Sequence, residues 1–298
     1  MTSTAGKVPP TFVINLARQV ERKRRMQAII STAGVKPVFI EAVDGSKLSS
    51  SELQPWRRSG KRSLLNAGEV GCLLSHISVW ERIVRDRIDH AVVLEDDLVI
   101  APTFRQILLR IGDLPEFDLL RIETDRSPIV FRQKSEMAIA GHHVHKLLRG
   151  ATRTGGYVIS RRGAHRLLAS VNDFEQAVDV EMFNPRRSVV DKLDMLQLVP
   201  AICVQAELVP GIAMQSPYLS SGIETLGQRA DTRLGKRRPT NPTAMESFRA
   251  IVRPAKRLAV NLLIRPLGQT ERPIPLIDCS APHWAVPNAS AGRSAGAG

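Results

Sequence analysis

Three consecutive carboxylates, Glu95, Asp96 and Asp97, directly follow the apolar run from Ala91 to Leu94. Ionised carboxylates repel one another and lose hydration on burial, so three together need a cation, basic side chains or open water nearby. Carboxylate oxygens are ligands that suit Mg²⁺ and Mn²⁺, and such an ion can bridge the phosphates of a nucleotide. The triplet therefore predicts a divalent cation site, and the residues alone leave open which two carboxylates meet the ion.

The position of the triplet favours a binding role. A continuous apolar run suits a strand of a largely parallel sheet that is buried on both faces. Ligands of open α/β sheets bind beyond the carboxyl ends of the strands, which is where the three acids fall. We therefore expect the turn after Leu94 to face a ligand.

The elements around this turn alternate between strand and helix. Residues 11–16 and 38–42 predict two strands with a basic helix between them, which is a β-α-β opening. Asn66 and Glu69 resemble a capping box, and the apolar residues that follow recur at helical spacing. His76 falls near that apolar stripe, so a role in the core and a role in the site both stay open.

The second half of this region alternates less clearly. Residues 117–123 predict a strand, whereas residues 124–153 have mixed polarity and predict a mobile or irregular region. Its three histidines, His142, His143 and His145, lack a matching metal-ligand pattern, which favours a solvated loop. Order returns at residues 155–168, where a glycine pair precedes a short strand and a helix; the pair indicates either a turn or a close approach of the backbone to a ligand.

Composition narrows the class of protein. The 298 residues are 43% apolar and contain three cysteines, too few for a disulfide framework. The N-terminus lacks the charged and apolar regions of a secretory signal, so we expect a cytoplasmic protein. The net charge of +13 predicts anionic partners. Aromatic residues make up only 4%, and basic stretches with interleaved aromatics are missing, so nucleic acid is an unlikely partner.

Much of the surplus charge lies near the C-terminus. Residues 229–272 contain 11 Lys or Arg and 3 Asp or Glu, a net of +8 from 11 − 3. A peripheral contact with an anionic membrane, on the inner face of the cytoplasmic membrane, and a merely solvated basic tail both stay open. The predicted organisation is a flexible N-terminus (1–10), an α/β domain (11–221), a basic, irregular or helical extension (222–283) and a disordered tail (284–298).

The sequence resembles glycosyltransferase family 25, the bacterial lipooligosaccharide galactosyltransferases and their relatives. The resemblance rests on an ordered set of segments: "FVINL", "ERKRRM", "EAVDG", "GEVGCLLSHISVW", "AVVLEDDLVI", "GGYVISRRGAHRLL" and "VDVEMF". It covers roughly residues 11 to 215, and the combination in this order is more specific than any one segment.

The resemblance implies a GT-A type nucleotide-sugar-binding fold with a mostly parallel sheet. It also implies a UDP-sugar donor, most often UDP-galactose, a divalent cation (Mn²⁺ or Mg²⁺), a glycolipid or oligosaccharide acceptor, and transfer with inversion. The metal ligands are then Glu95 and Asp97. The residues expected at the donor are Asn15, Arg22, Glu69, Ser75, His76, Glu95, Asp96, Gly155 and Gly156.

Inverting transfer needs a general base for the acceptor hydroxyl. Asp179 and Glu181 are the candidates for this base, for acceptor contact or for further metal coordination. Asp179 is favoured as the base because it matches the acid most typical of this family segment. Two other functions stay open: a module of the same fold that binds nucleotide or glycan without turnover, and a basic nucleic-acid-binding protein.

Overall fold

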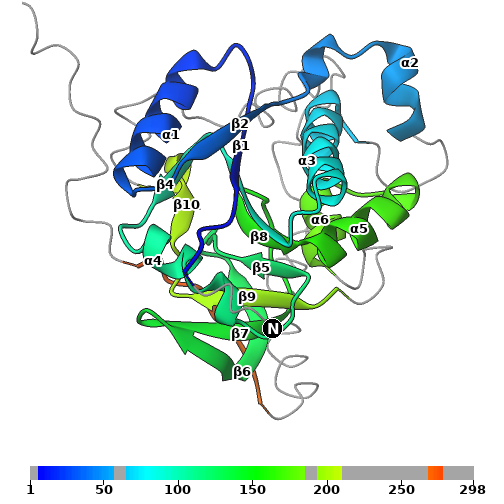
Figure 1. The fold of residues 1–298 in the computed structure, drawn as a ribbon. Coiled ribbons are helices and arrows are strands. Elements are labelled where there is room, and N and C mark those ends of the chain that lie inside the picture. Colours follow the sequence, from blue (N-terminus) through cyan, green and yellow to red (C-terminus); the bar gives the residue numbers. More distant parts are fainter. Residues whose placement is uncertain (1–5, 57–64, 185–192, 210–267, 278–298) are drawn as a thin grey trace, which may run out of the picture.

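A nine-stranded sheet forms the centre of the molecule (Figure 1). The computed structural model describes residues 6–56, 65–184, 193–209 and 268–277. The sheet has the strand order β11-β6-β7-β9-β5-β8-β3-β1-β2. Its strands are β1 (Thr11–Asn15), β2 (Pro37–Glu41), β3 (His90–Glu95), β5 (Leu119–Arg121), β6 (Pro128–Ile139), β7 (His142–Arg149), β8 (Gly156–Ser160), β9 (Met195–Val199) and β11 (Gln269–Pro273).

Most of these strands share one direction. β1 pairs in parallel with β2 and β3, and β5 pairs in parallel with β9. β8 is inserted antiparallel between β3 and β5, so those two strands also run the same way. β7 and β11 run against this direction, and β6 runs with it. The predicted α/β fold with a mostly parallel central sheet is confirmed.

Helices cover both faces of the sheet (Figure 1). One apolar core lies beneath α3 (Ala67–Arg85), α5 (Arg161–Ser170) and α6 (Val178–Phe183), and a second lies beneath α1 (Val20–Thr32) and α4 (Phe104–Leu108). Alternate residues of β1 enter the two cores: Phe12 and Ile14 enter the first and Val13 enters the second. This burial on both faces explains the continuous apolar runs of the central strands.

Shorter elements connect these layers. They are the helix α2 (Ser50–Leu53), the two-stranded sheet of β4 (Leu98–Ile100) and β10 (Cys203–Gln205), and 3-10 turns at Gly45–Lys47, Gln54–Trp56, Ile111–Asp113, Val171–Asp173 and Ala206–Leu208. The predicted capping box begins α3, because Asn66 Oδ1 accepts from Glu69 N at 3.0 Å and Glu69 Oε2 accepts from Asn66 N at 2.7 Å.

The prediction of an irregular region over residues 124–153 is wrong, because β6 and β7 form an antiparallel hairpin there. The hairpin turns at Ala140 and Gly141, both with positive φ angles, of 44° and 80°. Three register shifts interrupt the pairing, so the alternation of apolar and polar residues is broken along β6. The spacing of apolar residues therefore did not predict these two strands.

The expected solvated histidine loop is wrong for two of its three residues. His142 is fully buried, with Nδ1 2.7 Å from the carbonyl oxygen of Pro200. His145 is also buried, and its Nδ1 lies 3.0 Å from the carbonyl oxygen of Arg132. His143 is exposed. His142 therefore joins the hairpin to the backbone that follows β9, whereas His145 joins β7 to β6 within the hairpin.

Part of the predicted C-terminal extension belongs to the sheet. β11 pairs with β6 at its edge, and Ile274, which follows it, is buried in the first core. Only residues 268–277 of the predicted extension are among the described residues. The other residues of the extension and all of the predicted tail lie outside them. Among the described helices, none combines the length and the apolar character needed to cross a membrane.

Candidate functional site

The acidic turn lies where β1 and β3 end side by side. Ile14 of β1 is in register with Glu95 of β3, so the residue that follows, Asn15, reaches the turn. Asn15 Nδ2 donates to Asp96 Oδ2 at 2.7 Å, and Arg22 of α1 donates from Nη1 to Asp96 Oδ1 at 2.8 Å. The β-α-β opening thus brings an amide and a guanidinium onto the middle carboxylate.

Asp97 is the least compensated of the three acids. It is buried, and the nearest cation is Arg22 Nη1, at 3.7 Å from Asp97 Oδ2. Its Oδ1 has no hydrogen-bond partner among the described residues. Burial, followed by the charges of Glu95 and Asp96, raises the pKa of Asp97 to about 8. An unpartnered carboxylate oxygen in such a place fits a divalent cation, which would supply the missing positive charge.

Asp96 and Glu95 differ in how they are held. Burial raises the pKa of Asp96, although Arg22 and Asn15 oppose that shift. Glu95 Oε1 accepts from Thr154 Oγ1 at 2.8 Å, and Oε2 accepts from Gln205 Nε2 at 3.2 Å. Burial alone would raise the pKa of Glu95, but His76 and these hydrogen bonds outweigh it and lower that pKa. The pKa values of these two neighbouring carboxyl groups are therefore shifted in opposite directions, up for Asp96 and down for Glu95.

A cavity of about 460 Å³ opens over this turn. Eight of the residues predicted to act in the site line it: Arg22, Glu69, Ser75, His76, Glu95, Asp96, Asp97 and Asp179. Asn15, Gly155, Gly156 and Glu181 were predicted as well and are not among the described residues of its lining. The structure thus gathers the acidic turn, the α3 signature and Asp179 around one space.

The glycine pair contacts the interior of the protein. A Cβ on Gly155 would lie 2.7 Å from Glu123 Oε1 and 2.9 Å from the Leu98 side chain, and one on Gly156 would collide with Cys203 Sγ. Both positions therefore require glycine because β8 packs closely on its neighbours. Their close approach is to Glu123 and Cys203, and the assignment of the pair to the donor site stays a prediction.

Ser75 and Gly71 fix α3 against one wall of the cavity. Ser75 Oγ accepts from Val43 N at 2.9 Å and donates to the Gly71 carbonyl at 2.6 Å. A Cβ on Gly71 would lie 2.6 Å from the Val43 carbonyl oxygen, so only glycine permits this approach. Several residues of "GEVGCLLSH" therefore have a structural role: Glu69 caps the helix, and Gly71 and Ser75 dock it.

The two candidate bases lie in different surroundings. Asp179 lines the cavity, and its carboxylate accepts from the backbone N–H groups of Arg153, at 2.9 Å, and Val180, at 2.8 Å. Glu181 is fully buried, and its Oε1 accepts from the backbone N–H groups of Glu175 and Gln176, each at 3.0 Å. The contacts of Glu181 hold the loop before α6, whereas Asp179 faces the space in which a ligand would lie.

The lining also includes residues that were absent from the sequence-based prediction, among them Arg18, Arg153, Thr154 and Gln205. Arg18 pairs with Asp44, and Arg153 pairs with Glu207 at 2.6 Å. Arg153 also has a φ of 69°, a conformation that is uncommon for a residue with a side chain. Arg153 and Thr154 directly precede the glycine pair, so their position in the sequence could have marked them as candidates for the site. Gln205 is the last residue of β10, and no local sequence pattern marks it as a residue of the site.

Cations and anions of the cavity suggest what it accepts. Arg18, Arg22 and Arg153 line it together with the acidic turn. Guanidinium groups bind phosphate oxygens through paired hydrogen bonds, and carboxylates bind a divalent ion that in turn binds phosphate. The arrangement is therefore suited to an anionic ligand such as a nucleoside diphosphate.

Known proteins resemble the chain over the same region. A Drosophila melanogaster "Glycosyltransferase 25 family member" is 32% identical over 191 residues, covering 58% of this chain and 30% of the relative. The human "Procollagen galactosyltransferase 2" is 30% identical over 189 residues, covering 58% and 29%. A mouse "Inactive glycosyltransferase 25 family member 3" is 31% identical over 185 residues, covering 58% and 31%. The chain thus spans about a third of the length of these animal relatives.

Solved structures give weaker matches. A glycosyltransferase involved in glycosylation of the major capsid of PBCV-1 has a TM-score of 0.36 and 8% identity, covering 71% of this chain and 99% of that one. The similarity is too low to support a statement about function.

The family model described as "Glycosyltransferase family 25 (LPS biosynthesis protein)" matches residues 8–182, which include β1, the acidic turn, α3 and Asp179. The chain therefore belongs to glycosyltransferase family 25.

Proposed function

We propose that this protein is a metal-dependent, inverting hexosyltransferase that moves galactose from UDP-galactose to a lipooligosaccharide or another cell-surface glycan. The observation that carries the proposal is the cavity of a family 25 chain, in which Asp97 presents an unpartnered oxygen beside Glu95. Galactose is favoured because a similar protein is named a procollagen galactosyltransferase. The family description supports a lipopolysaccharide acceptor.

The donor would be held at the acidic turn. Glu95 and Asp97 would bind Mn²⁺ or Mg²⁺, with Asp96 kept in place by Asn15 and Arg22. When bound, the ion stabilises the charge that develops on the departing diphosphate. Arg18 and Arg153 line the same cavity and would contact the phosphates.

Asp179 would act as the general base. It would take the proton from the acceptor hydroxyl as the oxygen attacks the anomeric carbon and the bond to the diphosphate breaks. The backbone N–H groups of Arg153 and Val180 fix the carboxylate at the cavity wall. Glu181 is tied to the backbone of Glu175 and Gln176 and would hold the loop instead.

The test is UDP release from a panel of UDP-sugars, with Mn²⁺ or Mg²⁺ and an added acceptor glycan. We expect metal-dependent release from one sugar, lowered about 100-fold or more in Asp179→Asn. Glu181→Gln is the matched control, two residues away on the same helix, and should keep activity within about threefold. Equal losses in both variants would remove Asp179 from the role of base.

A second candidate is a module that binds nucleotide without turnover. The observation that favours it is the similarity to the mouse inactive family member, at 31% identity, which is as high as the similarity to the galactosyltransferase, at 30%. Calorimetric binding of UDP in the presence of Mn²⁺, together with no release from any sugar, would establish this function instead.

We also propose that the basic C-terminal part contacts an anionic membrane at the cytoplasmic face, where a glycolipid acceptor would lie. Each Lys or Arg near such a surface contributes about 1 kcal/mol. A truncation at residue 221 would remove β11 and Ile274 from the sheet and the core, so it is a poor test. Sedimentation with phosphatidylglycerol vesicles should instead be compared between the intact chain and the triple variant Lys236→Ser, Arg237→Ser, Arg238→Ser, and unchanged binding would contradict the contact.

A further inference from the structure

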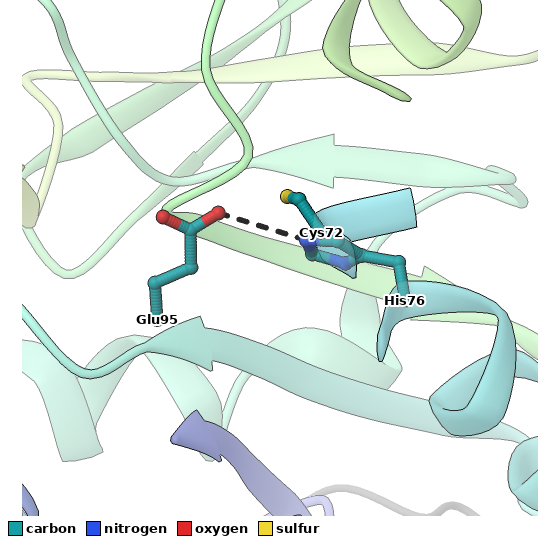
Figure 2. A group of neighbouring side chains, drawn as sticks. All are labelled: Cys72, His76 and Glu95. Carbon is teal, nitrogen blue, oxygen red and sulfur yellow. Dashed lines mark ion pairs between the residues drawn. The ribbon is translucent and has the colours of Figure 1, made fainter. Parts of the chain in front are cut away.

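Cys72, His76 and Glu95 converge at the side of the cavity (Figure 2). Cys72 and His76 lie one turn apart on α3, and Glu95 faces them from the end of β3. A sulfur, a ring nitrogen and a carboxylate oxygen from the three side chains all lie within 4.8 Å of one another. The spacing of four residues on a helix places two different ligand types on one face.

The His76 ring is aimed into this group. The side chain is buried, and its Nδ1 lies 2.8 Å from the Tyr157 hydroxyl, which also accepts from Trp80 Nε1 at 3.0 Å. Its Nε2 has no hydrogen-bond partner among the described residues. Glu95 Oε1 is 3.6 Å from Nε2, too far for a hydrogen bond. A buried ring nitrogen without a partner is costly, so its position calls for an explanation.

We propose that Cys72, His76 and Glu95 form a binding site for a borderline-soft divalent ion of the Zn²⁺ type. Thiolate, imidazole and carboxylate are the three ligand classes that zinc accepts, and three protein ligands leave a fourth position open to the cavity. Ligand atoms around tetrahedral zinc are about 3.5 Å apart, so binding requires the three side chains to draw together. Glu95 Oε1 would then exchange its hydrogen bond with Thr154 for the ion. Mg²⁺ is a hard ion and does not compete for the thiolate.

The charges and protons of the site balance on binding. The Cys72 thiol loses its proton to water, and the thiolate together with ionised Glu95 neutralises the two charges of the ion. His76 binds through Nε2 while Nδ1–H donates to Tyr157, the arrangement in which the second ring nitrogen of a ligating histidine is held by an outer partner. The ion thus gives His76 Nε2 the partner that no hydrogen bond supplies among the described residues.

The proposal does not need the transferase activity, although it shares Glu95 with the site proposed above. If the transferase function holds, zinc here withdraws a Glu95 oxygen from the donor site, and Zn²⁺ then inhibits UDP release in competition with Mn²⁺. Binding is measured directly, so a failure of the activity and a failure of this site give different results.

Titration of the intact chain with Co²⁺ tests the site, because cobalt bound to thiolate gives a near-ultraviolet charge-transfer absorption. We expect one equivalent to produce this band and Zn²⁺ to abolish it. Cys72→Ser should remove the band and weaken Zn²⁺ binding roughly 100-fold, and His76→Gln should weaken it similarly. Cys203→Ser, Cys279→Ser and His143→Gln are matched controls that should leave both unchanged. A missing band in the folded chain, or a band that survives in Cys72→Ser, would overturn the proposal.

A measurement on the unsubstituted protein tests the zinc site even if a variant does not fold. Alkylation of Cys72 by iodoacetamide, followed by peptide mass spectrometry, should slow at least tenfold with Zn²⁺ and stay unchanged with Mg²⁺. The same rate with and without Zn²⁺ would also overturn the site.

Discussion

Asp118 and Asp97 are both buried carboxylates, and they lie at opposite ends of strands that share a direction. Asp118 directly precedes β5, at its amino end, whereas Asp97 follows the carboxyl end of β3. Asp118 accepts from Arg162 Nε and Arg166 Nη1 at 2.7 Å each and from Asp194 N at 2.8 Å. Asp97 keeps one oxygen without a hydrogen-bond partner among the described residues.

The difference contrasts a carboxylate that holds the fold with one that we propose to bind a ligand. Both lose hydration on burial, but the partners of Asp118 come from the protein itself, on α5 and ahead of β9. The missing partner of Asp97 points to something bound from outside. Substitution at the two positions should therefore damage different properties.

The largest effect is expected from Asp97→Asn. Asparagine keeps the size of the side chain but removes a charged ligand, so metal-dependent UDP release should fall about 1000-fold. The free energy of unfolding without metal should change by less than about 1 kcal/mol, since no ion pair of good geometry is lost. Activity assays and urea unfolding check the two parts, and retained activity would remove Asp97 from the metal site.

The reverse outcome is expected from Asp118→Asn. The variant loses the charged acceptor of two arginines, which should lower the free energy of unfolding by about 2 to 3 kcal/mol. The arginine side chains are 39% and 42% exposed and can turn into water, which keeps the loss below that of a fully buried pair. Urea unfolding measures the loss of stability. Activity per folded molecule should stay within about twofold, and a larger drop would contradict a purely structural role for Asp118.

A smaller effect concerns pH. Glu123 is buried behind the acidic turn, and burial raises its pKa to about 8, with Arg121 opposing the shift. Between its ordinary value of 4.5 and about 8, the folded protein holds a proton that the unfolded chain has lost, so stability falls as pH rises through this window. The melting temperature of the metal-free protein should therefore fall between pH 6 and pH 8.

Glu123→Gln is the variant that tests this explanation. It should show a shallower fall over the same range, because glutamine does not ionise, while Asp97 still contributes a slope of the same sign. Identical slopes in the two proteins would mean that Glu123 ionises normally in the folded state.

The smallest effect is expected from Asn15→Ala. The change removes the donor to Asp96 Oδ2 but leaves Arg22 on Oδ1, so the turn should loosen without losing its charge balance. UDP release should fall about three- to tenfold, mainly through a higher concentration of Mn²⁺ at half-saturation. A metal titration of activity reads this directly, and a fall in the maximal rate alone would argue against a role in positioning.

Local patterns predicted much of this arrangement. The apolar run of β3 and the Asn66 capping box each depend on residues close in sequence, and both are found where expected. The resemblance to family 25 placed Asn15 at the expected donor, and the structure holds Asn15 beside the acidic turn. Thr154 and Gln205 contact Glu95 from residues 59 and 110 positions away, and no local period encodes such contacts.

Other parts escaped prediction for a different reason. The bulges of β6 broke the alternation that marks a strand, so the hairpin was mistaken for an irregular region. The glycine pair was noticed, but its packing against Glu123 and Cys203 is not revealed by sequence spacing. Whether a glycine faces a ligand or a neighbour depends on the tertiary structure.

The pairing of β11 with β6 has a consequence for synthesis of the chain. β6 ends at residue 139, yet its outer partner begins at residue 269, so about 130 residues are translated between the two strands. At a synthesis rate of about 5 to 20 residues per second, the backbone groups on that side of β6 wait on the order of ten seconds for their partner. An open strand edge is a template for pairing with other chains, so this interval is when the nascent protein is most exposed to misassembly.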